Sequence, residues 1–199
     1  MNPLLLIAGA YVLGSIPFGV VLARAHGVDL RQVGSGNIGA TNVARALGRK
    51  WAIAVLIGDA AKGFAPVWLG RRLHVPDAQV ALAGLAAIVG HMFTVFLRGR
   101  GGKGVATATG AFLAMAPLSV AGGILVFLIV ILATRFVSLA SMLSAASIPL
   151  FLHYLARAPF WSVVLAIFIA IAIIAKHHSN IARLTQGTER RMGAPREER

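Results

Sequence analysis

Long runs of apolar residues alternate with short polar segments along almost the whole chain. Six runs stand out, at about 3–24, 51–70, 79–97, 105–134, 138–156 and 160–176. Most are close to, or longer than, the roughly 20 apolar residues that a helix needs to cross a bilayer. Because lipid offers no hydrogen-bond partners to open strand edges, we expect helices throughout.

The run 105–134 is too long for one crossing. It contains no charged residue, and as a single helix it would be roughly 45 Å long. Pro117 lies near its middle, where the missing N–H interrupts a helix. The pattern therefore predicts two helices, 105–116 and 118–134. The expected fold is an all-α polytopic membrane protein with seven transmembrane helices, two of them short, and glycine-rich cytoplasmic loops.

Composition and charge agree with a membrane protein and give it an orientation. The chain is 58% hydrophobic and 13% charged, with a formal net charge of +13. If the N-terminus is outside, seven helices place every Lys and Arg on one side except Lys62, Arg71, Arg72 and Arg157. The positive-inside rule makes that side the cytoplasm, so we expect a bacterial cytoplasmic membrane protein with its C-terminus inside.

The same basic residues would suggest nucleic acid in a soluble protein. Here the hydrophobic fraction leaves little soluble surface, and anionic lipid headgroups are the better partner. We therefore expect that the protein does not bind nucleic acid. We expect one transmembrane catalytic domain over 1–184, followed by a basic, disordered cytoplasmic tail over 185–199.

A first glycine-rich run follows the first apolar segment. It reads Gly-Ser-Gly-Asn-Ile-Gly-Ala-Thr-Asn-Val-Ala-Arg over 34–45. Glycines let backbone N–H groups turn toward an anion, and a short helix is expected from about Thr41 to Leu47. The spacing places Asn42, Arg45 and Arg49 on one helical face. The candidate phosphate-binding residues are Ser35, Gly36, Asn37, Thr41, Asn42 and Arg45. The alternative is a plain loop whose arginines contact lipid headgroups.

A second glycine run, Arg-Gly-Arg-Gly-Gly-Lys-Gly over 98–104, leads into the next apolar segment. It is not a Walker A loop, because Gly104 stands where the magnesium-binding Ser or Thr should be. A glycine turn entering a helix still combines free N–H groups, a positive helix end and an ammonium group. Gly101, Gly102, Lys103 and Gly104 are therefore candidate anion ligands. A flexible loop with topogenic charges is the alternative.

A third polar cluster ends the last apolar segment. His177 and Asn180 lie one helical turn apart, and the His177 imidazole is a candidate general base or phosphate donor. Lys176 and Arg183 are expected to reach toward lipid headgroups. Ser138 and Ser141 open the segment 138–156; Ser138 is expected to cap the helix, and Ser141 to contact a ligand.

Two charged residues lie inside the segment 51–70. Asp59 and Lys62 are one turn apart, and each alone would cost roughly 2.5–3.5 kcal/mol at mid-helix. We expect a structural ion pair. His91, at the end of the segment 79–97, is expected to be structural rather than catalytic. No acidic cluster could hold two metal ions.

Taken together, the motifs resemble the bacterial acyl-phosphate:glycerol-3-phosphate acyltransferases, the PlsY family. The resemblance rests on the two glycine runs, the Gly-His-Met-Phe motif at 90–93, Val-Ser-Leu-Ala-Ser at 137–141 and the His-x-x-Asn-Ile-x-Arg-Leu pattern over 177–184. These motifs cover nearly the whole chain in order. A lysine precedes His177, where an arginine is common in the family.

The resemblance implies seven transmembrane helices, a cytoplasmic active site and no metal or other cofactor. It implies transfer of a fatty acyl group from acyl phosphate to the 1-position of glycerol 3-phosphate, giving lysophosphatidic acid and phosphate. A soluble enzyme that makes acyl phosphate is an expected partner, beside membrane lipid. We expect the 34–45 loop, His177 and Asn180 to hold glycerol 3-phosphate and residues 101–104 to hold acyl phosphate, although the two could be exchanged. The base is His177 or a substrate phosphate. The alternative function is a membrane transporter or binding protein for a phosphorylated metabolite or lipid.

Overall fold

The computed structural model describes residues 2–194, which form helices and no strand. The chain divides into two compact units, Met1–Met115 and Ala116–Arg199. The N-terminal unit contains α1 (Pro3–Ser15), α2 (Phe18–Ala25), α3 (Ala40–Ala46), α4 (Arg49–Arg72), α5 (Asp77–Met92), the 3₁₀ turn η1 (Val95–Leu97) and α6 (Val105–Met115). The C-terminal unit contains α7 (Pro117–Thr134), α8 (Val137–Tyr154), α9 (Phe160–Lys176) and α10 (His178–Thr185).

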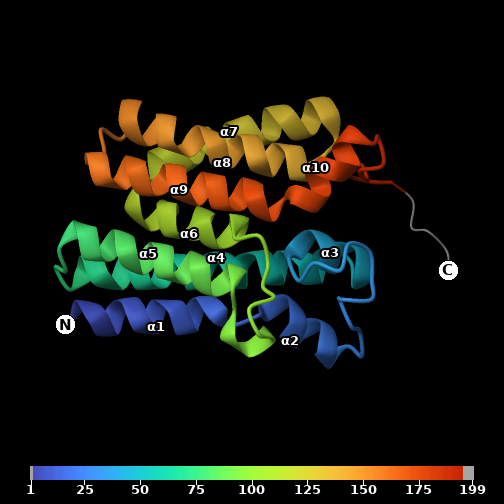
Figure 1. Cartoon of the computed structure of the whole chain (residues 1–199), viewed down its shortest axis with the longest axis horizontal. Helices are drawn as coiled ribbons and strands as arrows, with labels where there is room; N and C mark the ends of the chain where they lie inside the picture. The colour runs from blue at the N-terminus through green and yellow to red at the C-terminus, as the bar shows by residue number, and fades with distance from the viewer. Residues whose placement is uncertain (1, 195–199) are drawn as a thin grey trace. The chain divides into compact units, whose positions relative to one another are not determined.

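Glycines allow the helices of the N-terminal unit to cross closely. α1 packs against α5, and α4 packs against both α5 and α6 (Figure 1). A Cβ on Gly14 of α1 would overlap the backbone of Ala87, and one on Gly63 of α4 would overlap that of Thr107. Small residues at such crossings let backbones approach, which is how helices associate in lipid.

The first apolar segment is broken where α1 ends and α2 begins. Pro17 lies at the break, and its missing N–H cannot continue the ladder of α1. The carbonyl oxygens left over find side-chain donors from other helices. Thr94 Oγ1 donates to the Ser15 oxygen at 2.5 Å, and Lys62 Nζ donates to the Ile16 oxygen at 2.8 Å. The break is therefore fixed by contacts to the end of α5 and to α4.

In the C-terminal unit α8 packs between α7 and α9. Ser144 Oγ on α8 donates to the Gly123 oxygen on α7 at 2.8 Å, which satisfies a polar group on an apolar helix. α10 follows α9 directly and is bent by 58° from it. Large apolar side chains such as Leu132 and Phe160 point outward, 78% and 72% exposed, as expected for a surface that lipid covers.

Most helix boundaries agree with those predicted. The break at Pro117 is confirmed, because α6 ends at Met115 and α7 begins at Pro117. The expected short helix after the first glycine run is α3. Among the described residues, five helical segments are long and apolar enough to cross a membrane, or six if α9 and α10 form one bent span. α6, at 11 residues, is shorter, so the count of seven crossings stays a prediction.

The first part of the predicted tail lies within the described residues. Residues 186–194 lie in the described part of the chain, and Glu189 makes several hydrogen bonds there. Residues 195–199, where the tail was also predicted to be disordered, lie outside the described residues.

Candidate active site

The amide of Asn42 organises the first glycine loop. The side chain is 1% exposed. Its Oδ1 accepts the Ser35 N–H at 3.0 Å, and its Nδ2 donates to the carbonyl oxygens of Leu30 and Val33 at 3.1 and 2.9 Å. Both amide hydrogens are thus used within the loop. Asn42 holds the loop in shape, and a direct contact with substrate stays a prediction.

The loop turns where glycine is needed. Gly34 and Gly36 have φ of +58° and +68°, in the left-handed region that side chains disfavour. Asn37 Oδ1 accepts the Gly39 N–H at 2.9 Å, which closes an Asx turn before α3. Thr41, in the first turn of α3, is exposed.

Arg45 lies next to the loop, whereas Arg49 does not share its helix. A Cβ built on Gly34 would lie 3.4 Å from Arg45 Cδ, so the arginine side chain runs along the loop. α3 ends at Ala46, and Gly48 has φ of +95° before α4 begins at Arg49. The prediction that Asn42, Arg45 and Arg49 share one helical face is therefore wrong for Arg49.

The second glycine loop is attached to the end of α5. The Gly101 N–H donates to the Met92 oxygen at 3.2 Å, and the Gly102 N–H donates to the His91 oxygen at 3.0 Å. A Cβ at Gly101 would overlap the His91 carbonyl oxygen. The expected free N–H groups are thus not those of Gly101 and Gly102, which the end of α5 uses. The first turn of α6 presents N–H groups without intrahelical partners, and it follows the half-buried Lys103 and Gly104, whose φ is +85°.

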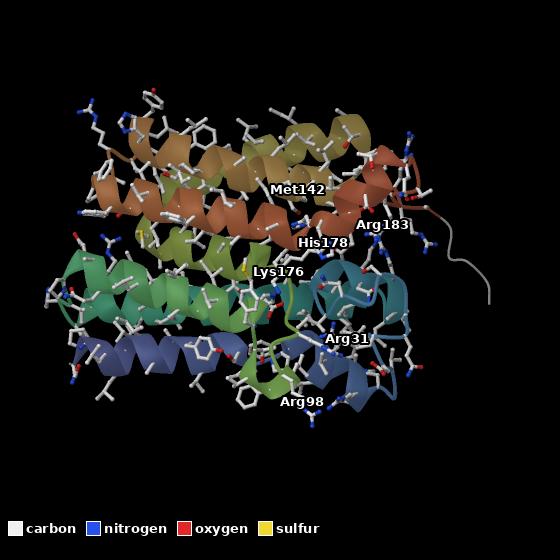
Figure 2. All side chains as sticks on the ribbon, viewed as in Figure 1. Arg31, Arg98, Met142, Lys176, His178 and Arg183 are labelled. Carbon is white, nitrogen blue, oxygen red and sulfur yellow. The ribbon has the colours of Figure 1, made fainter. Side chains whose placement is uncertain are left out.

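Arg31 links the two glycine loops. Its Nη1 donates to the Gly36 oxygen at 3.4 Å, and its Nη2 donates to the Arg100 oxygen. Arg31 lies in the segment between α2 and α3 (Figure 2). The sequence assigned Arg31 only to the charge of the cytoplasmic side. The two loops therefore lie together within the N-terminal unit.

The predicted residues of the C-terminal unit include a buried, hydrogen-bonded histidine. His177 is 2% exposed, and its Nδ1 lies 2.7 Å from the Ile173 oxygen. Because a carbonyl oxygen only accepts, Nδ1 of His177 carries a proton. Ser141 Oγ donates to the Val137 oxygen of its own helix at 2.8 Å, so its lone pairs rather than its proton are available.

Glu189, which sequence reasoning left in the tail, is bound by three side chains. Its Oε1 accepts from Ser138 Oγ and Asn180 Nδ2, both at 2.6 Å, and its Oε2 accepts from Arg183 Nε at 2.7 Å. Burial raises the pKa of Glu189, but the hydrogen bonds from its three donors and the charge of Arg183 outweigh burial and lower the pKa from its ordinary value of 4.5. The carboxylate thus stays ionised and ties α8 to α10.

Two expectations change because of Glu189. Ser138 makes no capping hydrogen bond to α8, so its predicted role as a cap is wrong; its hydroxyl binds Glu189 instead. Arg183, on α10 (Figure 2), pairs with Glu189 rather than only reaching toward headgroups. The one signal in the sequence was an acidic residue within a strongly basic segment.

The expected ion pair inside α4 is confirmed and has a third member. Lys62 Nζ lies 2.8 Å from Asp59 Oδ1, and both side chains are buried. His91 Nδ1 lies 3.5 Å from the same oxygen. Among residues 2–194, no three His, Asp or Glu side chains are grouped closely enough to hold a metal ion.

Known proteins resemble the chain over almost its whole length. The family model described as glycerol-3-phosphate acyltransferase matches residues 4–187. Two proteins named glycerol-3-phosphate acyltransferase, from Geobacter sulfurreducens and Aquifex aeolicus, are 52% and 46% identical to this chain. The matches cover 98% and 96% of this chain and all of each relative.

Two solved structures resemble the fold. One is PlsY, an integral membrane glycerol 3-phosphate acyltransferase, in its glycerol 3-phosphate form, with a TM-score of 0.92 and 45% identity over 97% of this chain and 96% of that one. Its lysophosphatidic acid form gives a TM-score of 0.90 and 43% identity, with the same coverage. This likeness makes the chain a multi-pass membrane protein. The chain belongs to the glycerol-3-phosphate acyltransferase family.

Proposed function

We propose that the chain transfers a fatty acyl group from acyl phosphate to the 1-hydroxyl of glycerol 3-phosphate, giving lysophosphatidic acid and phosphate. The observation that carries the proposal is the pair of glycine loops joined by Arg31 in the N-terminal unit. Arg45 lies along one loop and Lys103 in the other. Two cation-bearing loops suit a reaction between two phosphate-bearing substrates.

The chemistry needs positioning more than activation. Acyl phosphate is a mixed anhydride, so its carbonyl carbon is already electrophilic. The 1-hydroxyl oxygen attacks that carbon, the bond from the carbon to the phosphate oxygen breaks, and phosphate leaves with the electron pair. Holding both anions so that the hydroxyl lies beside the carbonyl carbon raises the effective concentration of the reacting groups. N–H groups and cations stabilise the negative charge that develops in the transition state.

Residues of both glycine loops are assigned to the substrates. Ser35, Gly36, Asn37, Thr41 and Arg45, with Asn42 supporting the loop, are proposed for glycerol 3-phosphate. Lys103, Gly104 and the first turn of α6 are proposed for acyl phosphate, with Gly101 and Gly102 fixing their position. Ser141, His177 and Asn180 of the C-terminal unit remain proposed substrate contacts on the evidence of the sequence pattern.

The hydroxyl proton has two candidate acceptors. The imidazole of His177, whose Nδ1 donates to the Ile173 oxygen, is one. An oxygen of a substrate phosphate is the other. Comparing His177→Gln with His177→Ala at saturating substrates separates them. A loss of kcat in both variants assigns the base to His177, whereas near-normal kcat assigns it to phosphate.

The direct test uses purified full-length protein in detergent. We expect release of phosphate and formation of lysophosphatidic acid when acyl phosphate and glycerol 3-phosphate are both present, and neither product when glycerol 3-phosphate is omitted. Thermal unfolding checks that the protein is folded. If folded protein forms neither product, the proposal is contradicted and the alternative of a transporter or binding protein is favoured.

The proposal includes an orientation in the bacterial cytoplasmic membrane. The N-terminus is placed outside, and the glycine loops and C-terminus in the cytoplasm, across seven helices of which α6 is short. Because the chain has no cysteine, a single introduced cysteine reports which side of the membrane its position faces. Cysteine at Gly99 or Thr188 should react with an impermeant thiol reagent only after the cells are opened, and cysteine at Asn2 should react before.

A contact with the soluble enzyme that makes acyl phosphate belongs to the same proposal.

A further inference from the structure

The end of α5 meets the second glycine loop through both the backbone and the side chain of His91. The His91 carbonyl oxygen accepts the Gly102 N–H at 3.0 Å. A Cβ built on Gly102 would overlap His91 Nε2 and would lie 3.0 and 3.2 Å from two ring carbons. The imidazole therefore lies directly against the Cα of Gly102, with no room for a side chain between them.

The imidazole is in turn fixed from its other side. His91 is 5% exposed, and its Nδ1 lies 3.5 Å from Asp59 Oδ1. Asp59 is held by Lys62, whose ammonium also donates to the Ile16 oxygen at the break between α1 and α2. The ring is thus held between the glycine loop and a buried polar cluster on α4, which is itself anchored to the end of α1.

We propose that His91 is a positioning residue that sets the path of the chain at Gly102, and thereby the placement of Lys103 and of the first turn of α6. The inference rests on the proposed function, in which these groups hold acyl phosphate. An anion ligand that shifts by an ångström loses much of its contribution, because electrostatic stabilisation depends on preorganised geometry. The ring acts through the loop and touches no substrate itself.

Gly102 offers a clean probe of this contact. Its φ is not in the left-handed region, so alanine is compatible with its backbone and adds only a methyl group. In Gly102→Ala that methyl must displace the loop from the ring. His91→Ala removes the support but leaves Asp59 paired with Lys62, and the double variant gives the methyl group the space that the ring vacates.

The experiment measures kcat, the KM for each substrate and the thermal unfolding temperature of the full-length protein in detergent. We expect Gly102→Ala and His91→Ala each to raise the KM for acyl phosphate about tenfold, and the double variant to be about tenfold less impaired than the product of the two effects, since contacting residues couple. The KM for glycerol 3-phosphate should change less than threefold in every variant. Gly9→Ala, where a Cβ would meet nothing within 4 Å, is the matched control and should behave like the original protein.

Two results would overturn the inference. If the single effects simply multiply in the double variant, the ring does not set the position of Gly102. If the unfolding temperature falls while the KM for acyl phosphate stays unchanged, the contact is only structural. Failure of the proposed function is distinct, because the unsubstituted protein would then release no phosphate at all.

Discussion

Arg31 donates a hydrogen bond to the main-chain oxygen of Arg100, 69 residues further along the chain. The same guanidinium donates to the Gly36 oxygen in the first glycine loop. Two loops that are remote in sequence are thereby held at a fixed separation within the N-terminal unit. A guanidinium can do this because its donors point in several directions within one rigid plane.

Replacing Arg31 should therefore damage activity more than stability. Arg31→Ala removes the hydrogen bonds to the Gly36 and Arg100 oxygens and frees the loops to separate. We expect kcat/KM to fall about 10–100-fold with little change in the unfolding temperature, because Arg31 is exposed. Arg31→Lys should not restore activity, since a single ammonium lacks the guanidinium fork.

Arg24→Ala is the matched control, because Arg24 is an exposed arginine near the end of the neighbouring helix α2. It removes the same charge without touching either loop. Equal losses in the Arg24 and Arg31 variants would mean that net charge, and not the link between the loops, is what matters.

Asn42 gives a second prediction, concerning the first loop alone. Asn42→Ala leaves the Ser35 N–H and two carbonyl oxygens without their partner, and each unsatisfied buried group costs about 1–3 kcal/mol. We expect a clear fall in unfolding temperature together with a raised KM for glycerol 3-phosphate. Gln32→Ala, which removes one exposed side-chain hydrogen bond to Asp29, should change neither measurement. A normal unfolding temperature in Asn42→Ala would contradict the role given to the amide.

The fold could be predicted from the sequence where the signal is local. Pro117 interrupts its helix for a backbone reason that neighbouring residues cannot alter, so that break was predictable. Asp59 and Lys62 lie one turn apart on one helix, so their pairing followed from helical geometry alone. The short helix α3 was likewise predictable, because it begins directly after the last glycine of the first run.

Contacts could not be predicted where a partner lies far away in the chain. His91 completes the Asp59–Lys62 cluster from another helix, and no periodicity relates the two positions. Asn42 looked like a substrate donor because the backbone atoms that occupy its amide belong to a loop whose path was unknown. Glu189 was hidden by its basic surroundings, and only the fold brings it to Ser138 and Asn180.

The buried pair in α4 should show the asymmetry typical of buried charges. Removing one partner leaves the other charged and unpaired, which costs about 3–5 kcal/mol, whereas removing both avoids that penalty. We expect Asp59→Asn and Lys62→Met each to lower the unfolding temperature strongly, and the double variant to recover much of the loss. Thermal unfolding in detergent measures this. A double variant less stable than both single variants would mean that the hydrogen bond from Lys62 to Ile16 outweighs the ion pair.

Glu189 predicts a stability that depends on pH. Its pKa in the folded protein is lower than the ordinary value of 4.5, so the unfolded chain takes up the proton more readily. The stabilisation is therefore fully present above the unfolded pKa and is lost as the pH falls through the folded pKa. Glu189→Gln should lower the unfolding temperature at pH 7, because a neutral amide accepts weaker hydrogen bonds from Ser138, Asn180 and Arg183.

The difference between Glu189→Gln and the original protein should shrink as the pH is lowered below 4.5, because the protonated carboxyl then resembles the amide. Asp77→Asn provides the control, since Asp77 is an exposed acid in the first turn of α5, and its small effect should vary much less with pH. Thermal unfolding of the three proteins across this range is the measurement. A difference for Glu189→Gln that stays constant down to acid pH would show that the side chain contributes by its shape rather than by its charge.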